Sequence, residues 1–307
     1  MVNIIDFSNW KEYEGASEGS GRSEKIWLKS DEGNIGLFKF PKIDPVDNEE
    51  TTEHISEHLA YKIGEVLGVP TAKVDLGFYN GRIGSMSYLI CNNNEFLSEG
   101  IWFISAKYPK YDTEKMRDGK TGKYYCIEHL FGSISYVHFG RMFIQMMLFD
   151  FLIGNSDRHQ SNWALLLGVE KGDGIKISIR QCPLYDNGSS LCCYVNKKEL
   201  TELLGSDKKR FEALVDSKSK SRIRIDGSKK SLPSHREVVQ YLFKNYSVSK
   251  EIAKDFLNRI SYEKINALIS EYPENVLSTE KKTLIEKFLK RKLEILENLL
   301  QEVETND

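Results

Sequence analysis

The sequence predicts an α+β fold in two lobes: a small, mostly β N-lobe with one key helix, and a larger, mainly helical C-lobe. Over the first 90 residues, short apolar runs alternate with turns and one helical segment, in the order strand, strand, helix, strand, strand. A polar break follows at residues 92–94, and from Arg236 to the end the pattern is mostly helical. We therefore expect residues 1–90 to form the N-lobe and residues 91–307 to form the C-lobe.

Two hairpins account for the strands of the N-lobe. The apolar runs Ile26–Leu28 and Ile35–Phe40 flank a polar turn, which predicts a first hairpin. The runs Val74–Tyr79 and Ile83–Ile90 are joined by Asn80-Gly81, a dipeptide that favours tight hairpin turns.

The single N-lobe helix is predicted over Thr51–Leu67. Apolar residues recur there at the three- and four-residue spacing of one helix face, and Gly68 with Pro70 ends the pattern. His54 and His58 lie four residues apart on this helix. A metal site would need a third ligand, and none is close in sequence, so we expect two histidines on the helix surface.

The C-lobe pattern begins with a buried helix over Val137–Leu152, after a polar segment, Lys107–Lys123, that we expect to be a surface loop. Trp163–Leu167 and Ile175–Ile179 are predicted strands. The last helix, Thr279–Val303, has an apolar face. We interpret this face as packing onto the C-lobe, with a coiled-coil partner surface as the alternative. Its residues are Ile285, Leu289, Leu293, Leu296 and Leu300.

Composition sets limits on function and location. Of 307 residues, 40% are hydrophobic and 29% charged, and the net charge of −2 does not indicate binding to nucleic acid or to an anionic membrane. The five cysteines form no C-x-x-C pair, which favours a reducing compartment. The N-terminus lacks signal-peptide character, and the most apolar run, Met142–Gly154, is too short to span a bilayer. We expect a cytoplasmic protein, with secretion as an effector left open.

The segment Gly154–Trp163 carries the strongest chemical signal. Asp157 and Asn162 stand five residues apart between a buried helix and a predicted strand. Phosphoryl transfer uses a carboxylate beside the attacking hydroxyl and oxygen ligands for magnesium, and the spacing D-x-x-x-x-N occurs in kinase catalytic loops. The alternative is a loop in which both side chains only cap backbone groups.

Asp186 is a second candidate metal ligand. It lies at the end of a predicted strand and is followed by Asn187 and Gly188. An aspartate at this point matches the second magnesium ligand of kinases. An Asp-Asn-Gly turn is the simpler interpretation of the same residues.

Lys39 lies within an otherwise apolar strand and therefore needs a partner or an outward direction. Strand alternation places it on the face opposite to Phe38 and Phe40. If the phenylalanines face the core, Lys39 is free to pair with ATP phosphates and with Glu57 on the following helix. An exposed lysine on an edge strand is the alternative.

Glycines are frequent before the first hairpin, at Gly15, Gly19 and Gly21. A glycine-rich turn lets backbone N–H groups approach phosphates, although the Walker A pattern is absent. A flexible N-terminal loop explains the same composition.

Together these motifs resemble the HipA-like kinase family, distant relatives of the phosphatidylinositol-3/4-kinase group. The segment Ser20–Lys25 is similar to the phosphate loop of that family, S-G-x-x-x-K before an apolar strand. Lys39-Phe40-Pro41 resembles its ATP-binding lysine motif, and Glu57 resembles its helix glutamate.

The C-lobe motifs extend this resemblance. Leu152–His159 with Asn162 is similar to the family's catalytic loop, L-I-G-N-x-D-x-H-x-x-N, and Leu184-Tyr185-Asp186 is similar to its metal-binding L-Y-D. HipA proteins carry a longer segment before the phosphate loop. The chain is therefore more similar to shorter members, such as the cell-translocating kinases and the toxins of three-part toxin–antitoxin systems.

The resemblance implies ATP and Mg²⁺ as cofactors and assigns roles to the motif residues. Asp157 would be the catalytic base, Asn162 and Asp186 would hold magnesium, Lys39 would bind the α- and β-phosphates, and Glu57 would orient Lys39. His159 would brace the catalytic loop. The nucleotide would also contact Ser20, Gly21, Arg22, Ser23 and Lys25, and its adenine would meet the backbone at Tyr88, Leu89 and Ile90.

The implied activity is transfer of the γ-phosphate to Ser or Thr of a protein substrate, by a toxin or an effector. Control by autophosphorylation is expected at Ser20 or Ser23, with Ser17 as a further candidate. An antitoxin or small regulatory partner would replace the extra N-terminal segment, and we expect no direct nucleic-acid binding. A lipid or small-molecule kinase and a non-catalytic nucleotide-binding module are the alternatives.

A basic run remains outside this scheme. It comprises Lys218, Lys220, Arg222, Arg224, Lys229 and Lys230. We interpret it as a solvated loop, with a phosphate- or acid-binding role as the alternative.

Overall fold

A computed structural model describes residues 1–15, 24–134, 139–171 and 175–305 of the chain. The chain forms two compact units, each built from three segments. Unit 1 comprises Met1–Leu89, Asp186–Glu212 and Ile260–Arg291, and unit 2 comprises Ile90–Tyr185, Ala213–Arg259 and Lys292–Asp307. The functional boundary expected near residue 90 stays a prediction.

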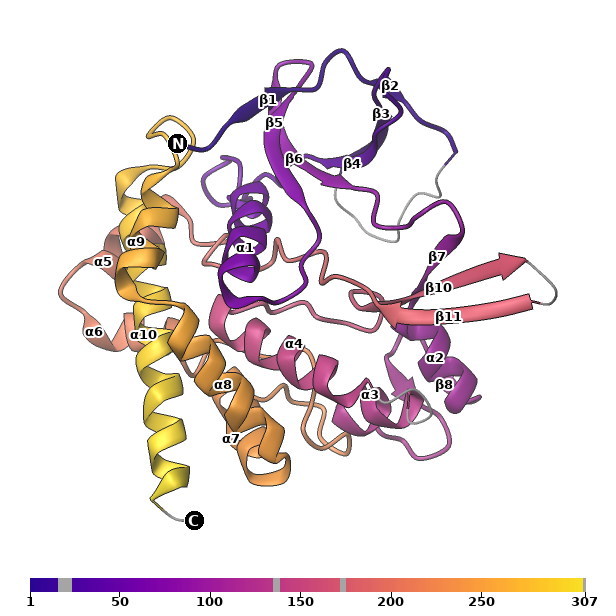
Figure 1. The fold of residues 1–307 in the computed structure, drawn as a ribbon. Coiled ribbons are helices and arrows are strands. Elements are labelled where there is room, and N and C mark those ends of the chain that lie inside the picture. The colour runs from indigo at the N-terminus through magenta and orange to yellow at the C-terminus, as the bar shows by residue number, and fades with distance from the viewer. Residues whose placement is uncertain (16–23, 135–138, 172–174, 306–307) are drawn as a thin grey trace. The chain divides into compact units, whose positions relative to one another are not determined.

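A curled sheet of six strands dominates unit 1 (Figure 1), in the order β1-β5-β6-β4-β3-β2. The strands are β1 (Ile4–Asp6), β2 (Lys11–Glu12), β3 (Lys25–Lys29), β4 (Ile35–Lys39), β5 (Val74–Tyr79) and β6 (Arg82–Tyr88). Both predicted hairpins are present, as β3–β4 and β5–β6. Asn80 and Gly81 have φ angles of 51° and 79°, the left-handed values that a tight hairpin turn requires.

The sheet core forms on one face of these strands. Phe38 and Phe40 are buried there with their ring centroids 5.1 Å apart, beside Phe7, Leu28 and Met86. Because side chains alternate along a strand, Lys39 lies on the opposite face of β4 from its two neighbours.

Helix α1 (Glu53–Leu67) packs against β5 and β6 and ends at Gly68, whose φ of 69° is left-handed. The expectation that His54 and His58 lie on its surface is wrong, because each is only 6% exposed. His58 Nδ1 lies 2.7 Å from the buried hydroxyl of Tyr272, since α9 (Tyr262–Ser270) covers this face of α1. Burial lowers the pKa of both histidines to about 4.

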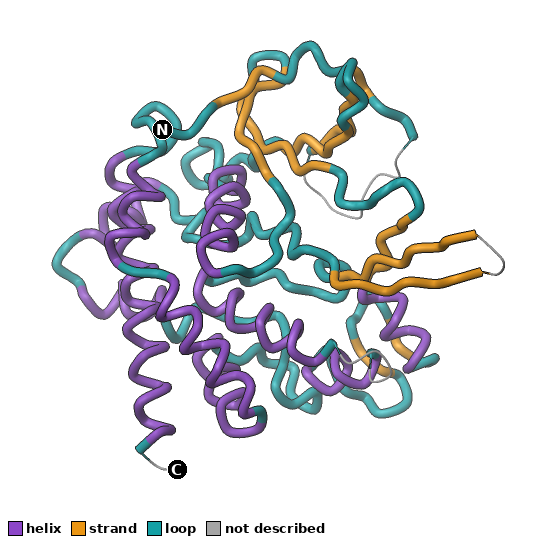
Figure 2. Tube along the Cα trace, in the orientation of Figure 1, coloured by secondary structure: helices purple, strands orange, loops and turns teal. Residues whose placement is uncertain are grey.

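Helices make up much of unit 2 (Figure 2). Helix α4 (Gly140–Ile153) is almost wholly buried and packs against α7 (His235–Asn245) and α8 (Ser247–Arg259). Two shorter helices, α2 (Gly100–Lys107) and α3 (Ile127–Ser133), contact each other. Helix α2 also contacts β7 (Glu95–Glu99), a strand of the sheet described next.

The sheet of unit 2 has the order β11-β10-β7, with β7 at Glu95–Glu99, β10 at Ala164–Lys171 and β11 at Ile175–Gln181. A second, small pair joins β8 (Tyr111–Asp112) to β9 (Arg117–Asp118). The segment predicted as a plain surface loop therefore contains paired strands, anchored by the buried Asp118.

The remaining helices are α5 (Lys197–Leu204) in unit 1, and α6 (Lys208–Val215) and α10 (Thr279–Glu304), which each contribute residues to both units. All five residues of the predicted apolar face of α10 are buried, so that face is not an open partner surface. No helix in the described part of the chain is long and apolar enough to cross a membrane.

Candidate active site

In unit 1, Lys39 and Asp186 form an ion pair. Lys39 Nζ donates to Asp186 Oδ1 at 2.6 Å, and the two side chains are 22% and 41% exposed. Burial opposes the charge on Lys39, but the carboxylates of Asp186 and Glu57 outweigh it and raise the pKa of the lysine. The strand lysine is therefore held as a cation beside two acidic groups.

Glu57 is buried behind this pair, with 3% exposed. Its Oε1 accepts the backbone N–H of Asn187 at 2.9 Å, which ties α1 to the residue after Asp186. Burial raises the pKa of Glu57, while the charge of Lys39 acts in the opposite direction. A Cβ added to Gly188 would lie 3.2 Å from Glu57 Oε2, so this position favours glycine.

Asp186 has a φ of 56°, a left-handed conformation that non-glycine residues rarely adopt. Aspartate tolerates it better than most residues, and such outliers gather at functional sites. Lys39, Glu57 and Asp186 are thus three predicted site residues that unit 1 brings together.

In unit 2, the predicted catalytic loop begins where α4 ends at Gly154, whose φ is 68°. Asn155 is buried and fixes the first turn: its Nδ2 donates to Asp150 Oδ1 at 3.1 Å, and its Oδ1 accepts the Asp157 N–H at 3.1 Å. The backbone around Asp157 is therefore set by α4.

A buried ion pair supports the loop from within. Arg158 Nε donates to Asp150 Oδ2 at 3.0 Å and Nη2 donates to Oδ1 at 2.8 Å, a two-pronged geometry that the guanidinium favours. Arg158 Nη1 also donates to the carbonyls of Asn162 and Tyr185, at 2.7 and 2.8 Å. One side chain thus connects α4, the end of the loop and the residue before Asp186.

Asp157 and Asn162 have different surroundings. Asn162 Nδ2 donates to the carbonyl of Asp157 at 2.8 Å, which leaves its Oδ1, a metal-binding atom type, facing away from that bond. Within residues 1–15, 24–134, 139–171 and 175–305, the Asp157 carboxylate takes part in no hydrogen bond or ion pair. Its acceptor capacity is therefore available to a substrate.

Among the described residues, the hydrogen bonds of His159 stay within the loop. Its Nδ1 accepts the N–H of Ser161 at 3.2 Å, and its backbone joins Asp157 and Asn162 through turn hydrogen bonds. This geometry is compatible with a bracing role, and the roles of all predicted site residues stay predictions.

A buried chain of polar side chains reaches the loop from the helices, and sequence analysis missed it. Lys292 Nζ donates to Ser219 Oγ at 2.9 Å, Ser219 Oγ lies 3.0 Å from His235 Nδ1, and His235 Nε2 lies 2.9 Å from the carbonyl of Asn155. Burial lowers the pKa of His235 to about 3. The imidazole is therefore neutral, and because a carbonyl only accepts, Nε2 carries the proton.

The other predicted nucleotide contacts are less informative. Ser17, Ser20, Gly21, Arg22 and Ser23 lie outside the described residues. Lys25 is directly opposite Lys39 in the β3–β4 register. The predicted adenine-binding connection spans both units, with Tyr88 and Leu89 in unit 1 and Ile90 in unit 2.

Two groups in that connection already have partners within unit 1. The Tyr88 hydroxyl donates to Asp75 Oδ2 at 2.7 Å, and the Leu89 N–H donates to the carbonyl of Ile35 at 2.9 Å. An adenine bound at this connection would have to form its hydrogen bonds with other backbone groups.

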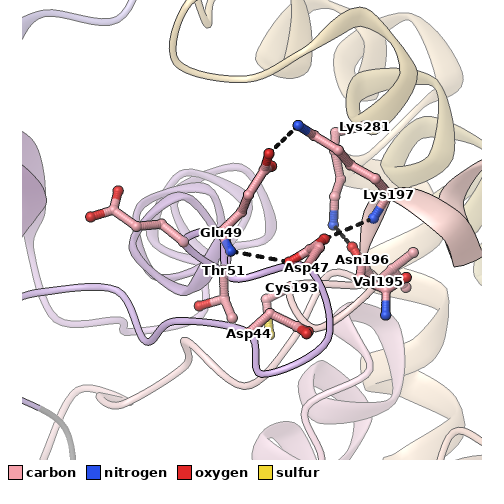
Figure 3. Close-up of a pocket in the computed structure, with 10 residues that line it drawn as sticks. Asp44, Asp47, Glu49, Thr51, Cys193, Val195, Asn196, Lys197 and Lys281 are labelled. Atoms are coloured by element: carbon pink, nitrogen blue, oxygen red, sulfur yellow. Dashed lines mark hydrogen bonds and ion pairs between the residues drawn. The ribbon is translucent and has the colours of Figure 1, made fainter.

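A small pocket of about 50 Å³ lies elsewhere in unit 1 (Figure 3). Lys197 pairs there with Glu49, its N–H donates to Asp47 Oδ2 at 3.2 Å, and Lys281 donates to the carbonyls of Val195 and Cys192. Lys197 and Lys281 thus have partners within the pocket lining, and none of the predicted site residues lines it. We therefore assign it no role in catalysis.

The described residues contain no cluster of three His, Cys, Asp or Glu side chains able to hold a metal ion. Magnesium bound with a nucleotide needs only one or two protein ligands beside the phosphates, so Asp186 and Asn162 have suitable donor atoms. Asp150 could have been noticed from sequence, because it is the one charged residue within the most apolar run. His235 and Lys292 gave no comparable signal.

Solved structures with a similar fold are known, whereas no protein-family model and no curated protein matches the sequence. The Helicobacter pylori proinflammatory kinase CtkA is similar with a TM-score of 0.78 and 20% identity, over 98% of this chain and 99% of that chain. HipA from the Shewanella oneidensis MR-1 complex of HipA, HipB and operator DNA has a TM-score of 0.56 and 13% identity. That match covers 94% of this chain and 66% of HipA.

The fold is that of the HipA-like kinases. The resemblance inferred from the motifs is confirmed at the level of the fold, and so is the predicted α+β, protein-kinase-like class. Identities of 20% and 13% establish the fold and leave the activity to be argued from the residues.

Proposed function

We propose that the chain is an ATP- and Mg²⁺-dependent kinase that transfers the γ-phosphate to a serine or threonine hydroxyl of a protein. The observation that carries this proposal is the contrast within the catalytic loop: Asp157 has an open carboxylate on a backbone that buried hydrogen bonds hold in place. A loop built only for stability would use that carboxylate as a cap.

Each residue then has a defined task. Asp157 accepts the proton of the attacking hydroxyl, and Lys39 neutralises charge on the nucleotide phosphates. Asp186 and the Oδ1 atom of Asn162 supply oxygen ligands to magnesium, which offsets the charge that develops during transfer. Glu57 holds the chain after Asp186 and keeps Lys39 protonated through its charge.

The Lys39–Asp186 ion pair supports the same proposal. Each group serves as the other's counter-ion. Phosphates would compete for the lysine and a divalent cation would compete for the carboxylate, so binding exchanges one set of charge pairs for another. Both groups are partly exposed, which makes this exchange possible without unfolding α1 or the sheet.

The decisive experiment compares the wild type with Asp157→Asn in a phosphotransfer assay with labelled ATP, Mg²⁺ and a mixed protein substrate. Removing a general base lowers the rate by about 10²- to 10⁴-fold, while nucleotide affinity and melting temperature should remain near wild type. A neighbouring control, Ser156→Ala, removes an exposed side chain from the same turn and should keep the activity. Equal activity of Asp157→Asn and wild type would refute the proposal.

Autophosphorylation of the phosphate loop at Ser20 or Ser23 remains part of the proposal. A phosphate adds about −1.5 to −2 charges where the nucleotide phosphates must bind, so it should weaken nucleotide binding. Intact-mass analysis after incubation with Mg-ATP tests this, with Asp157→Asn as the inactive control. An active enzyme whose loop gains no phosphate would contradict it.

A regulatory partner is also proposed. The HipA neighbour is described in a complex with HipB and operator DNA, which motivates a search for a small protein that binds this chain. Co-purification of the chain with the product of an adjacent reading frame would support this part of the proposal. Unchanged kinase activity in the presence of such a protein would exclude a regulatory role for it.

A further inference from the structure

Two arginines in unit 2 lie over one aromatic ring, and a third is close to them in sequence. The guanidinium carbons of Arg117, on β9, and Arg224 lie 5.1 and 5.0 Å from the centroid of the Tyr124 ring. Backbone bridges join Arg117 to Tyr124 and Cys126 to Arg224. Arg222, two residues before Arg224, adds a third cation whose charge acts on Arg224. We call Arg117, Arg222 and Arg224 the arginine cluster.

None of the three arginines forms an ion pair with a carboxylate in the described part of the chain. Arg117 Nε donates to the carbonyl of Gly122 at 2.7 Å, and Arg224 donates through Nε and Nη2 to the carbonyl of Lys230, at 3.1 and 2.8 Å. Arg222 Nε is buried and has no hydrogen-bond partner. Carbonyl oxygens orient these side chains without neutralising them.

The acidic groups of the same segments are engaged elsewhere. Glu128 pairs with Lys123, Asp118 accepts hydrogen bonds from Thr121, and Asp226 accepts from Ser228. Within the residues that the structure describes, none of these three carboxylates pairs with an arginine of the cluster, although Asp118 and Asp226, whose partners here are uncharged donors, keep their own charge.

An anion would add the charged partner that these arginines lack. Burial first, and then the charge of Arg222, lowers the pKa of Arg224, so the surroundings of this side chain oppose its positive charge. A guanidinium offers paired N–H donors that match a carboxylate, and stacking over a tyrosine ring fixes its plane. Uncompensated cations held in fixed positions are typical of a binding site for anionic groups.

The cluster is connected to the catalytic loop within unit 2. Tyr111, paired with Asp118 across β8 and β9, donates its hydroxyl to Gln160 Oε1 at 2.6 Å. Gln160 Nε2 donates to the carbonyl of Thr113 at 2.7 Å. Tyr125, next to Tyr124, accepts the indole N–H of Trp163 at 3.0 Å. The elements that carry the arginines thus hold both the middle and the end of the loop that bears Asp157.

We propose that the arginine cluster recognises acidic side chains of the polypeptide that the enzyme phosphorylates, so that the substrate is a protein segment with Asp or Glu near its acceptor hydroxyl. The term substrate rests on the proposed kinase function. Two arginines over a single ring, with the charge of Arg222 acting on one of them, make a compact site that suits one or two carboxylates. A nucleic-acid backbone would instead require a basic stripe along an extended face.

Binding can be measured without catalysis. The probes are two fluorescein-labelled peptides that carry one serine flanked by Glu in the first and by Gln in the second, and the readout is fluorescence anisotropy. We expect the wild type to prefer the Glu peptide, and Arg222→Gln/Arg224→Gln to weaken that binding by about tenfold, as the loss of charge-assisted hydrogen bonds implies. The matched control, Lys229→Gln/Lys230→Gln, removes the same charge from the same basic run and should change binding little.

A second variant covers the case in which the double arginine variant fails to fold. Arg117→Gln alters an exposed side chain on a different segment and should also weaken binding of the Glu peptide. Equal losses in the arginine and lysine variants would overturn the proposal, because they would indicate non-specific charge. Tighter binding of a single-stranded oligonucleotide, or of phosphatidylserine vesicles, than of the Glu peptide would also overturn it.

The kinase proposal and this proposal fail in different ways. A wild type that binds the Glu peptide through the arginines but transfers no phosphate would refute the kinase function and leave the acidic-peptide site standing. An active kinase that phosphorylates Glu- and Gln-flanked serines with equal kcat/KM would refute the acidic-substrate inference alone.

Discussion

The two sets of site residues are stabilised in opposite ways. In unit 1, Lys39, Glu57 and Asp186 act as counter-ions or hydrogen-bond partners for one another's segments, so the predicted site residues hold one another. In unit 2, the predicted catalytic loop is held by Asp150, Arg158 and other buried groups, while the Asp157 carboxylate stays open among the described residues.

This difference separates stability from chemistry. Substitutions in the unit 2 support should lower stability strongly, because they leave buried polar groups without partners. Substitution of Lys39 or Asp186 in unit 1 removes a partly exposed charge, which contributes little to folding, yet it should affect function directly. The predictions below test this contrast, from the largest expected effect on stability to the smallest.

Among the single substitutions, Arg158→Leu should have the largest effect. It leaves the Asp150 carboxylate buried without its ion-pair partner and removes the donors to Asn162 and Tyr185. Breaking one side of a buried pair costs about 3–5 kcal/mol. Urea denaturation followed by circular dichroism measures the loss. The control is Arg259→Leu, which breaks an exposed pair with Asp255 and should cost less than about 1 kcal/mol. Similar losses in both variants would contradict the contrast.

Acid pH should destabilise the protein through buried histidines. Burial lowers the pKa of His54 and His58 to about 4 and that of His235 to about 3, from an ordinary value of 6.5. As the pH falls below 6.5, the unfolded chain binds protons that the folded chain does not, so the free energy of unfolding decreases.

The slope should reach about 1.4 kcal/mol per pH unit for each histidine between pH 6.5 and 4. Denaturation curves at several pH values measure it, and His58→Gln should reduce the slope. A stability that stays constant from pH 7 to 5 would show that the histidines are not buried as neutral groups.

Ser219→Ala should have an intermediate effect. It removes the hydroxyl that links Lys292 to His235 and thereby loosens the support of the Asn155 carbonyl. Leaving buried polar groups unsatisfied costs about 1–3 kcal/mol. Ser249→Ala is the matched control, because Ser249 is also buried in unit 2 but, in the part of the chain that the structure describes, its hydroxyl donates only to the carbonyl of Tyr246.

Hydrogen exchange separates positioning from general stability. Peptides covering residues 155–162 should lose protection in Ser219→Ala and keep it in Ser249→Ala. Equal protection of this loop in the two variants would mean that the buried chain does not position it.

The sequence predicted the elements whose signals are local. Both hairpins and the course of α1 followed from apolar periodicity and from Asn80-Gly81, and the loop containing Asp157 and Asn162 was found by its spacing. The burial of His54 and His58 was missed because α9, about two hundred residues later, covers that face of α1. The periodicity of one helix does not indicate which distant segment of the chain packs against it.

The supporting groups of the catalytic loop were missed for the same reason. Ser219, His235 and Lys292 belong to three separate segments, and each is unremarkable in its own sequence context. The strand pair β8–β9 escaped notice because two-residue strands have no period to detect. Long-range contacts of this kind appear only when the fold is known.

Asp186→Asn should have the smallest effect on stability, below about 1 kcal/mol. Asparagine tolerates the left-handed backbone of this position, so no strain is added. Loss of the Asp186 charge removes the repulsion that helps to raise the pKa of Glu57, so Glu57 ionises more readily and can serve as counter-ion to Lys39.

Phosphotransfer should nevertheless be abolished, because an amide is a weaker ligand for magnesium than a carboxylate. Urea denaturation and an assay across a Mg²⁺ titration measure the two effects separately. A variant that loses several kcal/mol would identify Asp186 as a structural residue, whereas one that folds normally and keeps full activity would remove it from the metal site.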